Sequence, residues 1–429
     1  MTDTSSILIR IFEASDELEY LFGDSWPRIR EELIDLILRL STEGETVVLR
    51  QRADALLAQL LTSHAAVRVQ ELVREIRGPA AVSGSRSGGI VSSDQAALEV
   101  LAVEIPVFYA TDREEKPAND VEERYTGERG TLRFGLAKVK IPRTHRIGTV
   151  ETPRWWRFEF KADPSKHVVL LEIETMERAQ FVATLKDALA SADAQDVLLY
   201  VHGYSVKFAD AVRRSAQMAY DLRFPGRTVL FSWPSKGGKI GYPADEATVE
   251  WSTPHIEELL RLVLSETGAS TVHLISHSMG TRAVARAIER FDPSRLPPNS
   301  ATLQQIIFAA PDIDRDVFLQ IAAVFGGRAE RFTLYASHND VALKLSKTLH
   351  QGPRAGEAGD GIVILEGIDT IDASDADTSL FGLGHSYYAS KRTILGDIFT
   401  LLTNRTAPGK RFELMEYVSP RGTYWRYRP

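Results

Sequence analysis

Hydrophobic residues follow two different patterns along the chain, one before and one after a polar stretch near residue 80. Before it, apolar side chains recur three or four residues apart, which is the period of an amphipathic helix. Three such sets lie within residues 29–40, 48–61 and 67–76. Ser25 and Pro27 precede the first set, where a capping residue and a proline in the first turn are typical of a helix start. We therefore predict a small all-helical region over residues 1–78.

The stretch that follows has the composition of a flexible linker. Residues Gly78–Ser93 are rich in Ser, Gly and Ala, which do not build a packed core. We assign a linker to residues 79–98 and a second domain to residues 99–429. The apolar faces of the N-terminal helices need cover. The pattern therefore fits an adaptor or self-association module that gives a homo-oligomer or binds a protein partner, and it fits a helical extension packed on the second domain equally well.

In the second domain, short apolar runs that are typical of strands alternate with helical patterns. The expected antiparallel strands come first and are Glu104–Ala110, Arg133–Ile141, Trp156–Phe160 and His167–Glu172. The expected parallel strands are Val197–Val201, Thr228–Trp233, Val272–Ile275, Gln305–Ala309 and Arg331–Ala336. This alternation is the βαβ rhythm of a parallel sheet. The fold class is therefore α/β, with a mostly parallel central sheet, antiparallel N-terminal strands and flanking helices.

Three later segments complete this interpretation. Gly352–Gly361 is expected to be a mobile loop because of its glycines, and Arg411–Val418 is expected to add a late strand. The acidic residues between these segments are expected to lie in a solvated loop, with a cation site as the alternative. They are Asp369, Asp372, Asp375 and Asp377.

The segment Ser276–Gly280 stands between a predicted strand and the helical stretch Thr281–Phe291. A strand, a tight turn and a helix, with Ser278 at the middle of the turn, form the context of a nucleophile elbow. The strained turn presents the hydroxyl, and the helix N-terminus presents N–H groups where negative charge develops. Small residues must flank the serine. Gly280 supplies one, and Ser276 stands where the usual G-x-S-x-G pattern has its first Gly.

A nucleophilic serine requires a base, and the base requires an acid that orients it. In this fold both follow the nucleophile, the acid first. Asp340 comes just past the predicted strand Arg331–Ala336 and is the predicted acid, and His385, in a glycine-containing loop before a predicted helix, is the predicted base. Asp312 and Asp314 are the rival acids. They rank second because the strand before them lies nearer the elbow in the expected strand order.

Backbone donors for an oxyanion are expected at two places beside the serine. The predicted strand at Val197–Val201 runs into His202 and Gly203, and the glycine lets the chain turn so that the next N–H faces the site. We therefore predict that Tyr204 supplies one donor and that Met279, directly after the nucleophile, supplies the other.

Aromatic residues follow the next strand at the same edge of the sheet. Trp233 and Tyr242 are predicted to line an acyl or alcohol pocket, since such pockets are mostly apolar. Placement of Trp233 in the core is the alternative. His202 is assigned to bridging loops by hydrogen bonds or, alternatively, to contacting the substrate.

Taken in order, several short segments resemble those of one α/β-hydrolase family. They are Val107–Arg113, Val139–His145, His202–Tyr204, Phe231–Ser235, His277–Gly280, Ala310–Asp314, Ser337–Asp340 and Gly384–Tyr388. The series is similar to the bacterial family long known as domain of unknown function 900, over roughly residues 104–400. The resemblance implies an α/β-hydrolase fold and hydrolysis of an ester-like bond. It maps Ser278 to the nucleophile, His385 to the base and Asp340 to the acid.

Composition narrows the choice of partners and compartments. The formal net charge of −7 and the pI near 5.9 argue against a nucleic acid held by electrostatics. The chain has no cysteine, which excludes disulfides and thiolate chemistry. No apolar run approaches the ~20 residues of a membrane helix, and no signal-type core follows Met1, so a cytoplasmic location is expected. His273 and His277 share no helical face, so neither a metal nor another cofactor is expected.

The sequence therefore predicts a serine hydrolase that acts on a small-molecule ester. Ser278, Asp340 and His385 would form the triad, and the reaction would proceed through an acyl-enzyme. Two alternatives remain open on the same residues. One is an acyltransferase with the same triad, and the other is a non-catalytic interaction or adaptor protein that retains the hydrolase fold.

Overall fold

The chain divides into two compact units, residues 1–91 and 92–429, in a computed structural model. The structure describes residues 47–61, 102–116, 120–152, 162–236, 242–338, 352–374 and 388–428, together with residues 11, 28, 29, 32, 33, 35 and 36. Helix α4 (Val47–Leu61) belongs to the first unit, and its side chains Leu49, Ala53, Leu56 and Leu60 are buried on one face. The predicted helix at 67–76 and the linker 79–98 lie outside the described residues.

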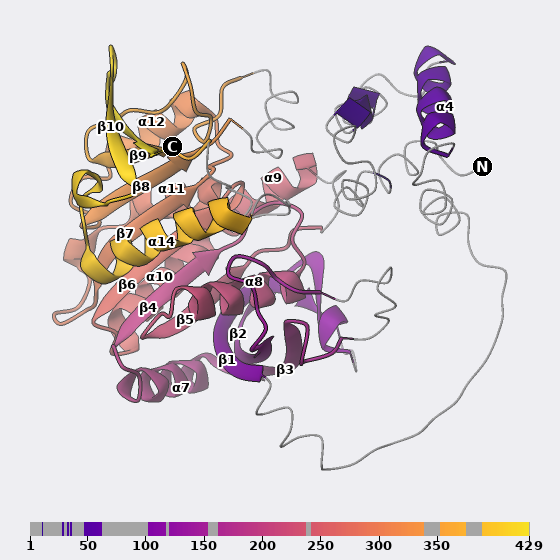
Figure 1. Cartoon of the computed structure of the whole chain (residues 1–429). Coiled ribbons are helices and arrows are strands. Elements are labelled where there is room, and N and C mark those ends of the chain that lie inside the picture. The colour runs from indigo at the N-terminus through magenta and orange to yellow at the C-terminus, as the bar shows by residue number, and fades with distance from the viewer. Residues whose placement is uncertain are drawn as a thin grey trace, which may run out of the picture. The chain divides into compact units, whose positions relative to one another are not determined.

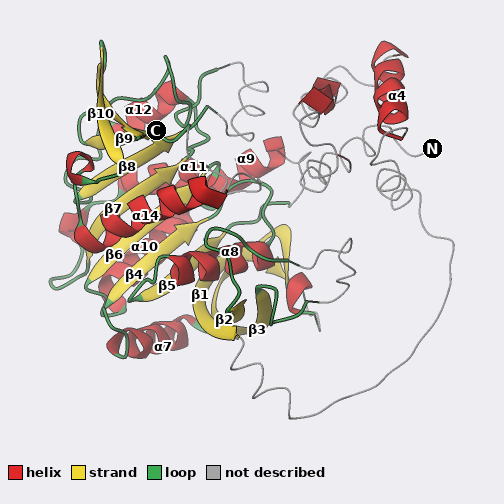
Figure 2. Cartoon of the chain, viewed as in Figure 1, coloured by secondary structure: helices red, strands yellow, loops and turns green. Residues whose placement is uncertain are grey.

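In the described part of the second unit, eleven strands form one mixed sheet (Figures 1 and 2) in the order β10-β11-β9-β8-β7-β6-β4-β5-β1-β2-β3. They are β1 (Ala102–Glu115), β2 (Tyr125–Pro142), β3 (Val169–Met176), β4 (Asp196–Val201), β5 (Arg227–Ser232), β6 (Thr271–His277), β7 (Thr302–Ala309), β8 (Arg331–Ala336), β9 (Ile368–Asp372), β10 (Leu414–Ser419) and β11 (Gly422–Tyr427). Neighbouring strands pair in parallel along the series β9-β8-β7-β6-β4-β5-β1. Strand β2 pairs antiparallel with β1 on one side and with β3 on the other. The predicted mixed sheet with antiparallel N-terminal strands is confirmed.

Helices cover both faces of this sheet. They are α7 (Arg178–Ala190), α8 (Phe208–Asp221), α9 (Tyr242–Trp251), α10 (Thr253–Glu266), α11 (Gly280–Arg290), α12 (Arg315–Ala322) and α14 (Tyr388–Asn404), with 3-10 turns at Val121–Glu123, Pro293–Arg295 and Pro408–Lys410. Figure 1 shows α8 and α14 crossing the same face, and their apolar side chains share one core. Side chains of α7, α9, α10, α11 and α12 fill the core on the other face.

The central strands are mostly apolar because both of their faces are covered. In β4, Val197 and Leu199 belong to the core on one face, whereas Leu198 and Tyr200 belong to the core on the other. All four side chains are buried. Successive side chains of a strand point to opposite faces, so a continuous apolar run of this kind is the expected signature of a buried parallel strand.

Two segments were expected to be loops, and the structure describes all of the first and part of the second. Within the segment Gly352–Gly361, the Ala355 N–H donates to the Ile313 carbonyl at 2.9 Å and the Gly356 N–H donates to the Pro311 carbonyl at 2.9 Å. These bonds hold the segment as a short ribbon against the loop that follows β7, and the Ala355 side chain is fully buried. The segment is a loop as predicted, its mobility stays a prediction, and its bonding partners lie about 40 positions away in the sequence.

The acidic stretch is not a solvated loop where the structure describes it, and this expectation is wrong. Asp369 and Asp372 lie in strand β9, where Asp369 pairs with Arg331 and Asp372 pairs with Arg426. Arginines on neighbouring strands therefore neutralise these carboxylates. Asp375 and Asp377 lie outside the described residues, as does the predicted strand at 156–160. The late strand is confirmed as β10, and its hairpin partner β11 was not predicted.

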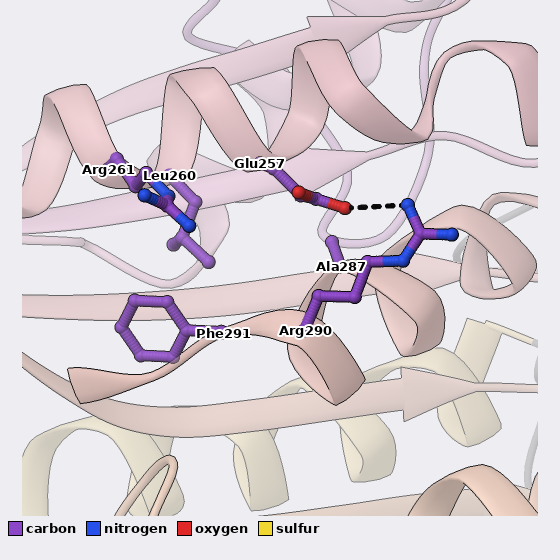
Figure 3. A pocket seen from close by; sticks show the side chains of 6 residues that line it. All are labelled: Glu257, Leu260, Arg261, Ala287, Arg290 and Phe291. Carbon is purple, nitrogen blue, oxygen red and sulfur yellow. Dashed lines mark hydrogen bonds and ion pairs between the residues drawn. The ribbon is translucent and has the colours of Figure 1, made fainter. Parts of the chain in front are cut away.

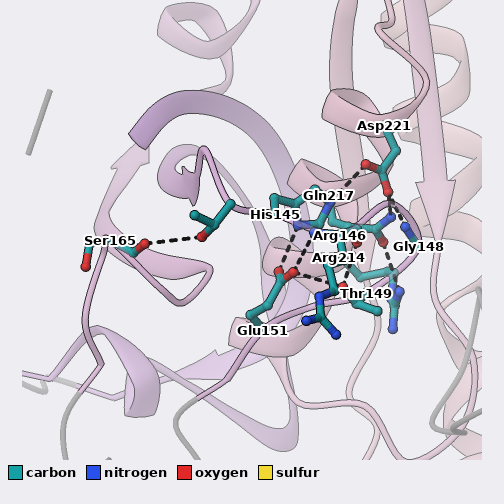
Figure 4. A network of polar contacts seen from close by, with 10 residues as sticks. His145, Arg146, Gly148, Thr149, Glu151, Ser165, Arg214, Gln217 and Asp221 are labelled. Atoms are coloured by element: carbon teal, nitrogen blue, oxygen red, sulfur yellow. Dashed lines mark hydrogen bonds and ion pairs between the residues drawn. The ribbon is translucent and has the colours of Figure 1, made fainter. Parts of the chain in front are cut away.

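A buried histidine links the loop after β2 to the end of α8 (Figure 4). The His145 Nδ1 lies 2.8 Å from Glu151 Oε2, and its Nε2 lies 2.9 Å from Asp221 Oδ1. The Gly148 N–H also donates to Asp221 Oδ2 at 2.6 Å. An imidazole that donates from both nitrogens is protonated. The cluster is therefore an imidazolium held between two carboxylates.

This cluster should make stability depend on pH. Burial alone would lower the pKa of His145, but hydrogen bonds to Asp221 and Glu151 outweigh burial and raise the pKa to about 9. The pKa in an unfolded chain is about 6.5, so the stabilisation is complete below that pH and is lost as the pH rises through about 9. We expect the thermal unfolding midpoint, measured by calorimetry, to fall across this range. His145→Gln should flatten that part of the profile, and equal slopes in both proteins would contradict the prediction.

Candidate active site

Ser278 stands in a strained turn between β6 and α11. Its φ of 48° lies in the left-handed region that non-glycine residues rarely adopt. The Ser278 N–H donates to the Ala309 carbonyl at 2.9 Å, and its carbonyl accepts from the Thr281 N–H at 3.1 Å. Strain at a single residue persists when surrounding contacts fix the backbone, and it concentrates at functional sites. This geometry is the one expected of a nucleophile elbow, and the nucleophilic role of Ser278 stays a prediction.

Close packing explains which small residues flank the serine. A Cβ atom on Gly280 would lie 2.3 Å from the His202 carbonyl oxygen, so only glycine fits there. At the other flank Ser276 is fully buried, and its Oγ lies 3.0 Å from Thr281 Oγ1. A serine is therefore accommodated where the usual pattern has glycine, because its hydroxyl has a partner.

The loop predicted to supply one oxyanion donor lies directly against Ser278. A Cβ atom on Gly203 would lie 2.5 Å from His277 Nδ1 and 3.0 Å from Ser278 Cβ. Tyr204 follows in this loop, and Met279 immediately precedes helix α11. The fold thus brings both predicted donor segments beside Ser278. Their role as oxyanion donors stays a prediction.

The predicted base and acid lie outside the described residues. Strand β8 ends at Ala336, a few residues before Asp340, and helix α14 begins at Tyr388, just after His385. Because β8 is parallel to β7 and β7 is parallel to β6, the chain leaves β8 at the same edge of the sheet as Ser278. Within the described residues, the Ser278 Oγ is buried and has no hydrogen-bond partner.

His202 and Trp233 are packed into the protein. The His202 Nδ1 lies 2.8 Å from the Gly203 carbonyl, so Nδ1 carries the proton and Nε2 is the acceptor beside Ser232 Oγ at 3.1 Å. Burial and the neighbouring Arg113 guanidinium hold the pKa of His202 well below its usual value. The Trp233 ring stacks on His202 at 5.1 Å and its Nε1–H donates to the His202 carbonyl at 2.8 Å. Both side chains are fully buried, which favours the structural alternative for each.

Sequence reasoning did not single out Arg113 as a structural centre of this site. Its guanidinium is buried at the end of β1, and Nε donates to Ser232 Oγ at 2.9 Å. Nη2 donates to the Val206 carbonyl at 2.7 Å and lies 3.3 Å from His202 Nε2, and Nη1 donates to the Ser235 carbonyl at 3.0 Å. Burial lowers its pKa to about 10, so it stays charged at neutral pH. Arg113 therefore joins the loops after β4 and β5, and the signal for it was a charged residue at the end of an apolar strand.

The two rival acids have different surroundings. The Asp314 carboxylate caps helix α12 by accepting from the Asp316 and Val317 N–H groups, each at 3.0 Å. Asp312 is fully buried, and its Oδ2 accepts from the Tyr242 hydroxyl at 2.6 Å. Tyr242 is itself buried and packs edge-on against Tyr204 at 5.2 Å. Tyr242 thus lies beside the loop that contains Gly203 and Tyr204, and its contact with substrate stays a prediction.

A small hollow lies between α10 and α11, away from this site (Figure 3). It is lined by Glu257, Leu260, Arg261, Ala287, Arg290 and Phe291. Arg290 Nη1, on α11, donates to Glu257 Oε1, on α10, at 3.2 Å. These α11 residues are at the C-terminal end of the helix, about 15 Å of helix rise from Ser278 at the other end. No serine or histidine lines the hollow, and it is separate from the candidate active site.

Among the residues that the structure describes, no group of three or more His, Asp or Glu side chains is placed to hold a metal ion. In the same residues, no helix is long and apolar enough to cross a membrane.

The comparison with family profiles agrees with this architecture. The sequence profile of a family described as "alpha/beta hydrolase of unknown function (DUF900)" matches residues 177–405, more than half of the chain. Among solved structures, the chain is similar to a protein assigned as a cell surface hydrolase of Lactobacillus plantarum WCFS1. That match has 11% sequence identity and a TM-score of 0.30, and it covers 51% of this chain and 96% of the other. No curated protein matches the chain significantly.

Proposed function

The chain belongs to the α/β-hydrolase family of unknown function DUF900, and from this we propose that it is a serine hydrolase that cleaves carboxylic esters. Family membership supports a hydrolase-type function, and the carboxylic ester is our more specific assignment. The observation that supports this assignment most is the conformation of Ser278, which follows a central strand directly and has a positive φ. The Gly203 loop packs against its Cβ, where an oxyanion would form.

The mechanism we propose is acyl transfer in two steps. The Ser278 Oγ attacks the ester carbonyl carbon while His385 accepts the hydroxyl proton, and Asp340 orients the imidazole. The N–H groups of Tyr204 and Met279 stabilise the oxyanion. When the tetrahedral intermediate collapses, the C–O bond to the alcohol breaks and His385 protonates the leaving oxygen. Water then attacks the acyl-enzyme by the same route and releases the acid.

A panel of chromogenic esters graded by acyl length tests this function directly. We expect burst kinetics on at least one member, because an acyl-enzyme that forms faster than it hydrolyses releases alcohol in a first rapid phase. Stable acylation without turnover, relieved by adding an alcohol or amine acceptor, would move the assignment to an acyltransferase. Absence of acylation by every ester would favour the non-catalytic alternative.

We also propose that the N-terminal helices serve self-association and not the chemistry. Residues 92–429 form a compact unit that contains the sheet and both cores. We expect a shortened chain that begins near Leu98 to fold and to hydrolyse short esters, but to differ from the full chain in subunit number, as measured by light scattering. An insoluble or inactive product would assign the helices to the catalytic unit. Equal subunit numbers would exclude the self-association role.

A further inference from the structure

Two strained residues lie side by side at the ends of β6 and β7. Ser278 has a φ of 48° and Ala310 a φ of 46°, and neither is a glycine. Main-chain hydrogen bonds hold the two turns together. The Ser278 N–H donates to the Ala309 carbonyl at 2.9 Å, and the Asp312 N–H donates to the Ser278 carbonyl at 3.1 Å. Strained backbone of this kind persists only where neighbouring contacts over-determine it.

Asp312 makes such contacts in several directions. Its carbonyl accepts from Arg282 Nε at 2.7 Å, and Arg282 lies in the first turn of α11, just after the elbow. Its Oδ2 accepts from the Tyr242 hydroxyl at 2.6 Å, and Tyr242 begins α9. Its Oδ1 faces Arg354 Nε at 3.5 Å, and Arg354 belongs to the ribbon against the β7 loop. A single buried residue thus contacts three elements around the nucleophile.

The contacts close into a ring. Arg282 Nη2 also donates to the Tyr242 hydroxyl oxygen at 3.2 Å, and Arg282 Nη1 pairs with Glu246 on α9. Each member of the ring is therefore held by two others. Arg354 is almost fully buried and the Asp312 contact is its ion pair within the described residues, so the carboxylate charge also balances a buried cation.

We propose that Asp312 is a positioning residue that holds Ser278 in its attack geometry through this ring, and that it is not the triad acid. The proposal rests on the serine-hydrolase function proposed above. Both carboxylate oxygens of Asp312 already have structural contacts: one accepts from the Tyr242 hydroxyl and the other faces Arg354. Its main-chain bond to Ser278 transmits any displacement of the β7 loop to the nucleophile.

The test is a set of matched variants assayed on an ester that the protein hydrolyses. Asp312→Asn keeps the size and an acceptor for Tyr242 but removes the charge that faces Arg354. We expect kcat to fall about 10²-fold with little change in KM, the scale of loss that a misplacement of about 1 Å produces. Labelling of Ser278 by a fluorophosphonate should slow in parallel, because that reaction needs the same placement of Oγ.

Tyr242→Phe deletes a single hydroxyl of the ring and serves as the second variant. It should reduce kcat in the same direction, and combining it with Asp312→Asn should cost less than the product of the two single losses, since both act through one network. If Asp312→Asn does not fold, as judged by circular dichroism, the kcat and the rate of fluorophosphonate labelling of Tyr242→Phe test the proposal instead. Asp314→Asn is the matched control, because asparagine caps a helix as well as aspartate does. It should leave kcat and KM unchanged.

The pH profile separates positioning from acid. With the acid and base intact, the pH at which kcat/KM reaches half its maximum should stay the same in Asp312→Asn. A shift of that pH in Asp312→Asn, together with a loss of kcat as large as in Asp340→Asn, would make Asp312 the triad acid and overturn the proposal. Activity and labelling equal to wild type in both Asp312→Asn and Tyr242→Phe would remove the ring from the mechanism. Failure of the enzyme assignment itself would show differently, as unchanged turnover in Ser278→Ala.

Discussion

Replacement of Ser278 by alanine should abolish turnover, with a loss in kcat on the order of 10⁶-fold, because the residues of a triad act as a unit. The serine occupies a turn whose φ of 48° alanine can also adopt at similar cost, so the backbone of the elbow should be kept. The change therefore removes the nucleophilic oxygen and little else. Steady-state hydrolysis of the best chromogenic ester measures the loss.

A neighbouring serine provides the matched control for this prediction. Ser276 is buried near the end of β6, two residues before Ser278, and its hydroxyl lies against Thr281 Oγ1 at 3.0 Å. Ser276→Ala should therefore retain most activity. A fluorophosphonate should label wild type and Ser276→Ala at Ser278, as located by peptide mass spectrometry. Label found on Ser276, or full activity in Ser278→Ala, would refute the elbow assignment.

The parallel core of the fold could be predicted because its signals are local. Strand β6 contains the mostly apolar run Val272–Ile275 and is followed at once by a turn and a helix, so the local pattern indicates a buried strand that runs into an elbow. The same argument places β4 before the Gly203 turn. In both cases the residues that decide the structure are adjacent in the sequence.

The features that sequence reasoning missed depend on distant partners. Strand β9 carries acidic residues that resemble a loop until Arg331 and Arg426, from other strands, are placed beside them. Arg113 bonds to residues that lie about 90 to 120 positions away. Asp312 and Tyr242 are separated by 70 positions. Composition and spacing cannot report such contacts, because they describe only the neighbourhood of each residue along the chain.

Replacement of Asp340 by asparagine should lower kcat by up to ~10⁴-fold, since an amide in place of the carboxylate favours the wrong imidazole tautomer of His385. The support for this assignment is the position of Asp340 in the sequence just after β8. Strand β8 runs parallel to β7 and β6 and ends at the same edge of the sheet as β6. The measurement is kcat on a chromogenic ester, with Asp314→Asn as the control of equal chemistry. Asp314 caps α12, so its change should be close to neutral.

The size of the loss distinguishes the three aspartates from one another. A triad acid acts on the tautomer of the base, so the activity of Asp340→Asn should be partly restored at high pH, where hydroxide can take the proton of the Ser278 hydroxyl in place of His385. A positioning residue acts on where Ser278 lies, so Asp312→Asn should lose about 10²-fold at every pH. Should Asp340→Asn retain wild-type activity while Asp312→Asn or Asp314→Asn loses nearly all of it, the acid belongs to the loop after β7. The order of elements would then depart from the one expected for this fold.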